Sequence, residues 1–290
     1  MTSANDLHLY ERRDDYIPRV AAVHDLCGYG KCSLGIAIPV LSAAGIDVCP
    51  VPTGLFSSHT AFPGWYMHDT TDILGDYLAA WAGIGVELDA VYSGFLGAPE
   101  QVDIIKQVWE TYPKALRVVD PVMADHGKVY PTYTPELVEA MGTLANGADI
   151  LTPNLTEAAI ILGREWQGTD VDEPTVREMI LELRERGAKN VVLKGIEHGD
   201  GLIHNYVWGD AIDFTETTNA KLPYMLHGTG DVFASTLLAA VMAGRDLAEA
   251  TAFAADFTAD AMLISAKQPN FEDRGVSFEP LLGKVTALLG

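Results

Sequence analysis

The sequence predicts an α/β fold in which a mostly parallel sheet carries helices on both of its faces. Three observations predict it. Short β-branched runs alternate with longer amphipathic stretches along most of the 290 residues. The strand-like runs are apolar almost throughout, which is typical of strands buried on both faces of a parallel sheet. The helix-like stretch Glu173–Arg186 has Pro174 at its start and Gly187 just past its end, as helices commonly do.

Strands and helices are expected to alternate as far as Lys194. The strands are expected at Arg19–Val23, Ile46–Val51, Ala90–Ser93, Leu116–Val119, Asp149–Leu151 and Asn190–Leu193. The helices are expected at Ser33–Ala44, Thr71–Gly83, Pro99–Tyr112, Pro135–Leu144, Leu155–Leu162 and Glu173–Arg186. Beyond Lys194, the stretches Gly201–Trp208 and Ala211–Thr217 predict a hairpin, and three helix-like stretches follow. No linker or repeat interrupts the pattern, which predicts a flexible arm over residues 1–18 and a single domain over residues 19–290.

Composition restricts the classes of partner. The formal net charge is −21, with 40 acidic and 19 basic residues. This balance argues against nucleic acid or a membrane surface as the main partner, because phosphate binding relies on clustered Lys and Arg. The three cysteines, Cys27, Cys32 and Cys49, form neither a disulfide framework nor a CxxC metal pair, and the N-terminal segment lacks the apolar run of a signal peptide. We therefore expect a cytoplasmic protein that spans no membrane.

The loops after the expected strands are where a site is sought, because ligands of open α/β sheets bind beyond the carboxyl ends of the strands. The first such loop, Gly28–Ser33, partly matches two phosphate-binding motifs. As a P-loop it has Asp25 in place of the first glycine and Cys32 in place of the hydroxyl residue. As a dinucleotide fingerprint it has Ser33 in place of the third glycine, so a nicotinamide-dependent dehydrogenase is a remote alternative. A tight turn that lets the backbone approach a ligand is favoured.

The most informative motif is His227-Gly228-Thr229-Gly230-Asp231, which precedes a run of small apolar residues. The two glycines permit a turn with free N–H groups, and such groups at a helix N-terminus bind anions. Asp231 could simply cap the helix. A plain cap does not require both glycines, so the motif favours an anion site beside a catalytic carboxylate.

This motif resembles the signature of the ribokinase-like superfamily of small-molecule kinases, which implies a three-layer sandwich. Further motifs follow the order seen in pyridoxal kinases between about Arg19 and Ser265, and together they are specific where each alone would be weak. They are Ser58-His59-Thr60, Ser93-Gly94-Phe95-Leu96-Gly97, Asp120-Pro121-Val122-Met123, Thr152-Pro153-Asn154-Leu155-Thr156-Glu157 and Val192-Leu193-Lys194-Gly195. The resemblance implies phosphorylation by ATP of the hydroxymethyl group of a vitamin B6 vitamer (pyridoxal, pyridoxamine or pyridoxine), in pyridoxal phosphate salvage.

The resemblance also implies a role for each residue. Asp231 would take the proton of the hydroxymethyl group as its oxygen attacks the γ-phosphate. An Asp of ordinary pKa, about 4, suffices for this if proton transfer is late in a loose transition state. The amides of Gly228, Thr229 and Gly230 would stabilise the charge on the transferred group.

The remaining roles concern the nucleotide, the metal and the vitamer. The resemblance implies ATP contacts from Asp120, Thr152, Glu157 and Lys194. Asp120 and Glu157 would also hold Mg²⁺, directly or through water. Vitamer contacts would come from Asp25, Thr60 and Phe95. Because this set of residues offers ATP one lysine among several carboxylates, we expect activity to depend on Mg²⁺. Pyridoxal kinases are commonly homodimers, which implies the same here, and Met123–Pro131 is the expected lid.

One position departs from the pyridoxal kinase pattern. Many of those enzymes carry Ser where this chain has Asp25, and an Asp there resembles the hydroxymethylpyrimidine kinases of thiamine synthesis. Those kinases usually carry Cys in place of Asp231 and lack the motifs at 58–60 and 93–97, so a B6 vitamer remains the first choice. Asp25 favours pyridoxamine or pyridoxine at least as much as pyridoxal. A non-catalytic vitamer- or nucleotide-binding protein is a further alternative, and the retained Asp231 argues against it.

Overall fold

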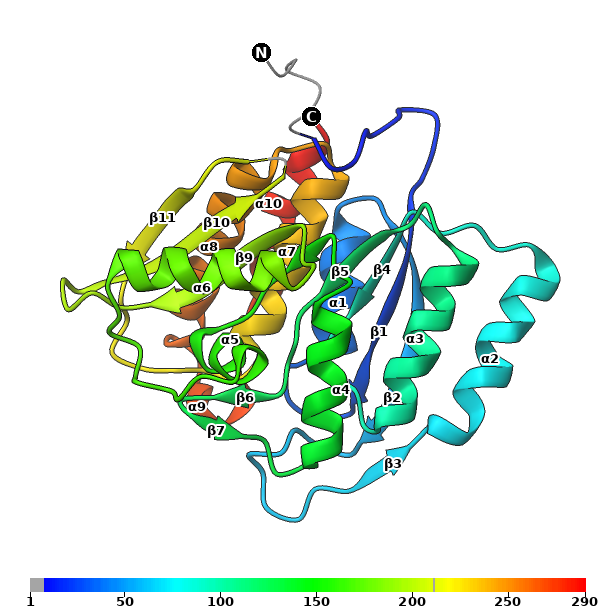
Figure 1. Cartoon of the computed structure of the whole chain (residues 1–290), viewed down its shortest axis with the longest axis horizontal. Helices are drawn as coiled ribbons and strands as arrows, with labels where there is room; N and C mark the ends of the chain where they lie inside the picture. The colour runs from blue at the N-terminus through cyan, green and yellow to red at the C-terminus, as the bar shows by residue number, and fades with distance from the viewer. Residues whose placement is uncertain (1–7, 211) are drawn as a thin grey trace.

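A single mixed sheet organises the molecule. The computed structural model describes residues 8–210 and 212–290, and within them a nine-stranded sheet has the order β11-β10-β9-β8-β5-β4-β1-β2-β3 (Figure 1). Its neighbours from β9 to β2 pair in parallel, whereas β3, β10 and β11 are antiparallel to the strands beside them. The strands are β1 (Arg19–Cys27), β2 (Asp47–Phe56), β3 (Met67–Asp69), β4 (Ala90–Ser93), β5 (Leu116–Val119), β8 (Ile150–Leu151), β9 (Asn190–Ile196), β10 (Leu202–Gly209) and β11 (Thr215–Ala220).

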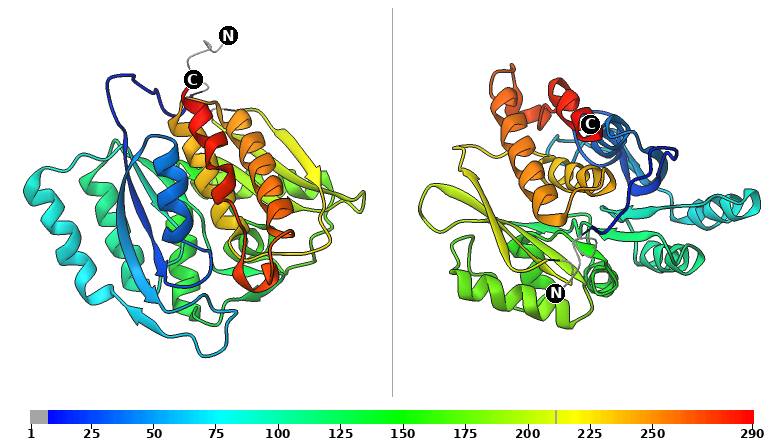
Figure 2. Two further views of the ribbon diagram at one scale, coloured as in Figure 1. Left: turned by 180° about the vertical axis from the view of Figure 1, so that it is seen from behind. Right: turned by 90° about the horizontal axis from the view of Figure 1, so that it is seen from above.

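Helices cover both faces of this sheet, as the right-hand view of Figure 2 shows. One face carries α2 (Thr71–Ile84), α3 (Pro99–Thr111), α4 (Pro135–Ala145), α5 (Leu155–Leu162) and α6 (Glu173–Glu185). The other carries α1 (Leu34–Ala43), α7 (Thr229–Met242), α8 (Leu247–Ser265) and α10 (Leu282–Thr286), near the short α9 (Phe271–Arg274). Two short 3₁₀ turns, Glu279–Leu281 and Ala287–Leu289, flank α10. No helix of the described residues is long and apolar enough to cross a membrane.

Side-chain alternation along the strands gives each face its own core. In β1, Ala21 and Val23 contribute to the core under α2–α6, and Val20 and Ala22 to the core under α1, α7 and α8. This is the period of two expected of a strand buried on both sides. The structure therefore confirms the predicted fold class, a three-layer sandwich around a mostly parallel sheet.

The predicted elements differ from the observed ones mainly at the ends of strands. Ala90–Ser93, Leu116–Val119 and Leu155–Leu162 coincide with β4, β5 and α5. β2 runs on to Phe56 because its last residues pair with β3, a strand too short and polar to predict. In the hairpin, β11 begins later than predicted, and the predicted start, Ala211, lies outside the described residues.

Of the predicted N-terminal arm, residues 1–7 lie outside the described residues. Residues 8–18 lie against the domain rather than away from it. Arg12 donates hydrogen bonds to the carbonyls of Ala44 (3.2 Å) and Gly45 (3.1 Å). The hydroxyl of Tyr16 donates to Asp89 (2.9 Å). The expected flexible arm therefore does not extend over residues 8–18.

Candidate active site

The carboxyl ends of β5, β8 and β9 bring three of the predicted residues together. Lys194 Nζ lies 2.7 Å from Asp120 Oδ1, and the hydroxyl of Thr152 donates to the same oxygen at 2.9 Å. The Asp120 side chain is fully buried and that of Lys194 is 12% exposed. The second oxygen, Asp120 Oδ2, is buried and has no hydrogen-bond partner. Since buried polar atoms are normally paired, this oxygen is free for a ligand.

Glu157, also predicted as a metal ligand, is already engaged by the backbone. Its Oε2 accepts the N–H of Asn154 (2.9 Å) and its Oε1 accepts the N–H of Met123 (3.2 Å). With the Asn154 side chain, it forms the capping box that starts α5. Burial raises the pKa of Glu157 well above its ordinary value, although Lys194 opposes the shift. Both oxygens keep a further lone pair, so Glu157 fits contact with a metal through water better than direct ligation.

The start of α7 carries the glycine motif for which an anion site is predicted. Gly228 precedes the helix with a φ of +85°, and a Cβ there would lie 2.4 Å from the carbonyl oxygen of Lys31, so only glycine fits. The recorded hydrogen bonds of the described residues engage none of the amides of residues 228–230, as is usual in a first helical turn. A Cβ on Gly230 would lie 3.7 Å from Lys194 Nζ, so the helix start faces the lysine.

Asp231, in the first turn of α7, is a stronger base than the sequence suggested. Burial, reinforced by the charge of Asp120, raises the pKa of Asp231 to about 7, and a hydrogen bond from the N–H of Ser33 only partly opposes this. The other oxygen, Asp231 Oδ1, is buried without a partner. The assumption of an ordinary pKa was therefore wrong, because the surrounding elements exclude water from this carboxylate. A base whose pKa lies near neutral pH is well matched to general base catalysis.

Ser33 is a site residue that the sequence reasoning treated only as a missing glycine. It precedes α1 with a φ of +52°, an uncommon conformation for a residue with a Cβ. Its hydroxyl donates to Asp25 Oδ1 (2.5 Å), while its N–H donates to Asp231. Burial raises the pKa of Asp25 to about 6 against this hydrogen bond. One residue thus positions both carboxylates, and no sequence signal marks a serine that adopts a positive φ.

The two other predicted vitamer residues lie next to residues that border this group. Phe95 is 8% exposed and packs edge-on against Phe56 and Tyr133, with ring centroids 5.5 and 5.7 Å away. Burial, together with the charges of Glu157, Asp25 and Asp120, raises the pKa of Tyr133, so the ring that Phe95 touches lies near these carboxylates. Thr60 is exposed on the loop after β2, and its neighbour His59 stacks on His227, with ring centroids 4.8 Å apart. The structure groups Asp25, Asp120, Thr152, Glu157, Lys194 and residues 228–231, and vitamer contacts from Thr60 and Phe95 stay predictions.

The expected lid, Met123–Pro131, is a small two-stranded ribbon. β6 (Ala124–Asp125) and β7 (Lys128–Val129) pair with each other, and the turn between them has positive φ at His126 and Gly127. The N–H of Gly127 donates to the hydroxyl of Thr156 in α5 (3.0 Å). The ribbon therefore lies beside the capping-box helix, and its closure over the site remains a prediction.

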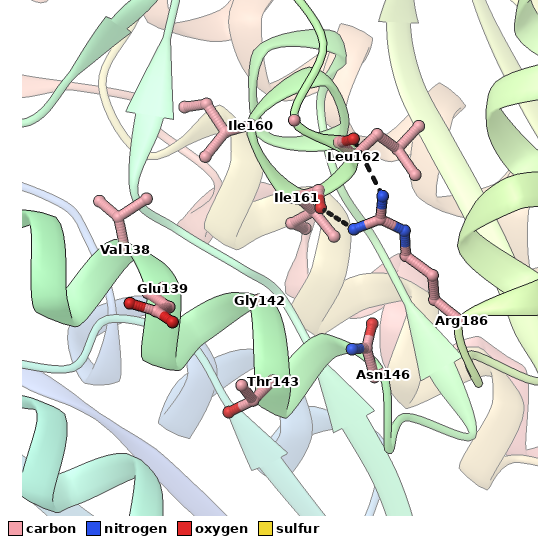
Figure 3. Close-up of a pocket in the computed structure, with 10 residues that line it drawn as sticks. Val138, Glu139, Gly142, Thr143, Asn146, Ile160, Ile161, Leu162 and Arg186 are labelled. Carbon is pink, nitrogen blue, oxygen red and sulfur yellow. Dashed lines mark hydrogen bonds between the residues drawn. The ribbon is translucent and has the colours of Figure 1, made fainter.

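A cavity of about 350 Å³ lies elsewhere, between α4 and α5 (Figure 3). Arg186 borders it and donates to the carbonyls of Ile161 (2.6 Å) and Leu162 (3.0 Å) at the end of α5. Helices that follow parallel strands run back toward the opposite edge of the sheet, so this cavity faces away from Asp231. None of the predicted site residues lines it, and its one cation is occupied in capping a helix.

Comparison with known proteins gives consistent results. The family described as phosphomethylpyrimidine kinase matches residues 68–274. A pyridoxal kinase, PdxY, of Pseudomonas syringae pv. tomato is 27% identical over 257 residues, which are 82% of this chain and 85% of that protein. The solved pyridoxal kinase of Lactobacillus plantarum is 28% identical with a TM-score of 0.87, covering 94% of this chain and 98% of its own. A Bacteroides thetaiotaomicron protein, described as a candidate phosphomethylpyrimidine kinase and crystallised with pyridoxal, is 32% identical with a TM-score of 0.89, covering 93% and 96%.

Proposed function

The chain belongs to the phosphomethylpyrimidine kinase family, and we propose that it transfers the γ-phosphoryl group of ATP to the hydroxymethyl group of a vitamin B6 vitamer. One observation carries the proposal. Asp231, whose Oδ1 is buried without a partner, and the unpartnered amides at the start of α7 lie beside Lys194. The relatives named above as pyridoxal kinases, and the Bacteroides protein crystallised with pyridoxal, favour a vitamer over hydroxymethylpyrimidine.

The arrangement supports an in-line transfer with Asp231 as general base. The hydroxymethyl oxygen attacks the γ-phosphorus while its proton passes to Asp231 Oδ1. The bond from the γ-phosphorus to the bridging oxygen breaks and ADP leaves. The amides at the start of α7 and the ammonium group of Lys194 stabilise the negative charge of the transferred group, because they are fixed in place before the reaction. Thr152 holds Asp120 in the orientation that pairs with Lys194.

Mg²⁺ belongs to the proposal as the metal that accompanies ATP. Asp120 fits it, because Oδ2 is an unpartnered, buried carboxylate oxygen, the kind of ligand that Mg²⁺ prefers. When bound, the ion neutralises charge on the phosphate groups. Glu157 would contact it through water, since both of its oxygens already accept backbone N–H groups. Removing divalent metal with a chelator is expected to abolish turnover, and adding excess Mg²⁺ to restore it. Full turnover in the chelator would contradict the role of Asp120.

Asp25 is proposed to contact the vitamer ring and to set the preference among vitamers. Its carboxylate is buried, accepts from Ser33, and carries a pKa raised to about 6 by that burial. A buried carboxylate is stabilised by a donor or cation supplied by the ligand, such as a protonated ring nitrogen or an exocyclic amine. We therefore expect pyridoxamine and pyridoxine to be used at least as well as pyridoxal. The proposed contact of Thr60 comes from the loop after β2, and that of Phe95 from the segment after β4.

The proposal also includes a homodimer in the cytoplasm. The outer side of α2, next to the edge strand β3, exposes the apolar side chains of Ile73 (51%), Tyr77 (38%) and Ile84 (79%). Such exposure at one edge supports association of two copies. The mass measured by light scattering during size-exclusion chromatography is expected to be twice the 31.3 kDa of one chain. A single-chain mass at micromolar concentration would contradict the dimer.

The decisive experiment is a phosphorylation assay with ATP and Mg²⁺ on four substrates taken separately: pyridoxal, pyridoxamine, pyridoxine and hydroxymethylpyrimidine. Product formation is followed by mass spectrometry and ADP release by a coupled assay. We expect all three vitamers to be phosphorylated with higher kcat/KM than the pyrimidine. Exclusive use of the pyrimidine would establish the alternative kinase instead. Binding of vitamers without any product would indicate a non-catalytic binding protein.

A further inference from the structure

A second cluster of titratable side chains lies at the other end of the sheet from α2, where the turn after β9 meets the β10–β11 hairpin. His198 lies in that turn, His204 and Tyr206 on β10, and Glu216 on β11. Tyr206 pairs directly with Glu216 across the hairpin, and His204 is two residues before Tyr206 on the same strand. Since side chains two residues apart share a face, the three strand residues project together. This hairpin cluster is separate from Asp120 and Asp231.

The side chains of the hairpin cluster are in direct contact. His204 Nδ1 lies 2.6 Å from Glu216 Oε1, and the hydroxyl of Tyr206 donates to the same oxygen at 2.6 Å. His198 Nε2 lies 2.8 Å from the Tyr206 hydroxyl, and the two imidazole centroids are 4.4 Å apart. One nitrogen of each histidine and one oxygen of Glu216 all lie within 4.8 Å of one another. Three groups that commonly ligate metals therefore converge on one point.

Carboxylates surround this point on several sides. Asp200 lies 3.1 and 3.2 Å from His204 Nε2, so that imidazole sits between two carboxylates. Burial lowers the pKa of His204, but the hydrogen bonds to Glu216 and Asp200 outweigh it and hold the pKa above its ordinary value. At the start of α6, Asp172 interacts with His198, and Glu173 adds negative charge near Tyr206. The carboxylates of Asp200, Glu216, Asp172 and Glu173 thus make the hairpin cluster favourable for a cation.

The donor set indicates a transition metal rather than Mg²⁺. Imidazole nitrogens suit Zn²⁺, whereas Mg²⁺ prefers oxygen ligands in octahedral geometry. Zn²⁺ lies about 2.0–2.2 Å from His nitrogen and carboxylate oxygen. The 2.6 Å contact of His204 with Glu216 would therefore widen by less than about 1 Å to admit the ion between tetrahedrally placed ligands. Glu216 is 41% exposed and provides the path of entry, while His204 is 7% exposed and provides the fixed side of the site.

We propose that His198 Nε2, His204 Nδ1 and Glu216 Oε1 form a Zn²⁺ site, with solvent completing the coordination. Asp200 acts as the positioning residue, because a carboxylate on the second nitrogen of a ligating histidine fixes its tautomer and orientation. On binding, the ion takes the place of the direct contact between His204 Nδ1 and Glu216 Oε1. The Tyr206 hydroxyl remains protonated and donates to Glu216. The ion would link the turn after β9 to β10 and β11. Lys194 lies on β9.

The test uses the full-length protein without an affinity tag, stripped of metal and titrated calorimetrically with Zn²⁺ in excess Mg²⁺. One equivalent is expected to bind and to raise Tm. His198→Ala and Glu216→Gln each remove one ligand and are expected to weaken binding by more than about 100-fold, whereas Asp200→Asn weakens it about 10–100-fold. His68 is an exposed histidine of β3, so His68→Ala is the matched control and is expected to leave Zn²⁺ binding unchanged.

Two results would overturn the proposal. If Zn²⁺ binds equally well to wild type, His198→Ala and Glu216→Gln, the ion lies elsewhere, for example at Cys27 and Cys32. If folded wild type takes up no stoichiometric Zn²⁺, the hairpin cluster is only a hydrogen-bond network. Because Glu216 is exposed and Gln preserves its shape, Glu216→Gln is expected to keep the fold, which circular dichroism verifies. Substitution with Co²⁺ provides an independent reading, since its visible absorption bands report the coordination geometry, and their change in His198→Ala would assign that ligand.

Discussion

The proposed catalytic edge, which comprises Asp120, Lys194 and Asp231 (hereafter the catalytic edge), and the hairpin cluster use carboxylates in opposite ways. At the catalytic edge, the buried oxygens Asp120 Oδ2 and Asp231 Oδ1 have no partner. In the hairpin cluster, His204 and Glu216 each have at least one partner. An unpaired buried oxygen costs stability, so it persists where a ligand supplies the missing partner. The hairpin cluster is satisfied without a ligand, and a metal there would replace the contact between His204 and Glu216 rather than supply a missing partner.

The largest expected effect comes from changing the free base at the catalytic edge. Asp231→Asn keeps the size of the side chain but removes its ability to accept the hydroxymethyl proton. We expect kcat to fall by about 10²–10⁴-fold, the usual contribution of a general base, with vitamer and ATP binding largely kept. Steady-state kinetics together with calorimetric titration separate the two. Unchanged turnover would show that the free oxygen is not catalytic.

Removing the cation of the catalytic edge is expected to cost stability as well as nucleotide binding. Lys194→Ala leaves the fully buried Asp120 without its charged partner, and breaking a buried pair typically costs about 3–5 kcal/mol. Lys284, which pairs with Asp260 on the surface, is the matched control, and Lys284→Ala is expected to cost about 0–1 kcal/mol. Urea unfolding measures both. Equal losses would mean that burial does not distinguish the two ion pairs.

The free energy of unfolding is expected to depend on pH with opposite signs in the two regions: the contribution of Asp231 falls as pH rises, and that of Glu216 falls as pH falls. The folded pKa of Asp231, about 7, lies above the unfolded value near 4. The folded protein therefore binds more protons, and this residue's contribution to the free energy of unfolding falls as pH rises through that window, by up to about 1.4 kcal/mol per pH unit. The pKa of Glu216 is lowered by Tyr206, so its contribution is present above its unfolded pKa and is lost as pH falls through the folded value.

Unfolding measured from pH 4 to pH 8 for wild type, Asp231→Asn and Glu216→Gln tests this contrast. Asp231→Asn is expected to flatten the decline between pH 4 and pH 7, and Glu216→Gln to reduce the loss on the acid side. Activity should show the matching pattern, because the free enzyme needs Asp231 deprotonated and kcat/KM rises with pH toward about 7. A decline of stability that is unchanged in Asp231→Asn would assign it to other groups.

The smallest effect expected is the difference between two substitutions of Ser33. Ser33→Ala and Ser33→Gly both remove the hydroxyl that donates to Asp25, but only glycine accepts the positive φ without strain. We expect Ser33→Gly to be more stable than Ser33→Ala by about 1 kcal/mol. The KM for the vitamer should rise in both, since Asp25 loses its donor equally. Identical stabilities would show that the backbone conformation costs nothing here.

The sequence predicted the elements whose signals are local. β4, β5 and α5 were predicted to the residue because each is a short apolar run bounded by polar residues or a capping motif. β3 and the ribbon of β6 and β7 were missed because two or three residues carry no periodicity. β11 was placed too early, since its sequence Thr215–Ala220 is polar and half exposed, and only pairing with β10 defines it.

In the candidate site, too, some features were predictable from the sequence and others depend on contacts that the sequence does not show. Grouping Asp120, Thr152, Lys194 and Asp231 was predictable, because parallel strands deliver their carboxyl ends to one edge. Other features depend on contacts between distant segments. The raised pKa of Asp231 requires its burial beside Asp120, and the double role of Ser33 requires a backbone conformation that serine rarely adopts. The spacing Asn154-x-x-Glu157 is that of a capping box, which the interpretation of Glu157 as a metal ligand did not include.

Three glycines near the catalytic edge show how late this part of the molecule can form. A Cβ on Gly30 would lie 2.0 Å from the His59 ring, one on Gly228 would lie 2.4 Å from the Lys31 carbonyl, and one on Gly275 would lie 2.8 Å from the His227 carbonyl. These contacts join segments that the ribosome makes far apart in time, and contacts of long sequence separation form slowly. A nascent chain still lacking Gly275 holds most of its sheet and cores but not the completed edge. Catalytic competence should therefore be the last property to emerge during synthesis.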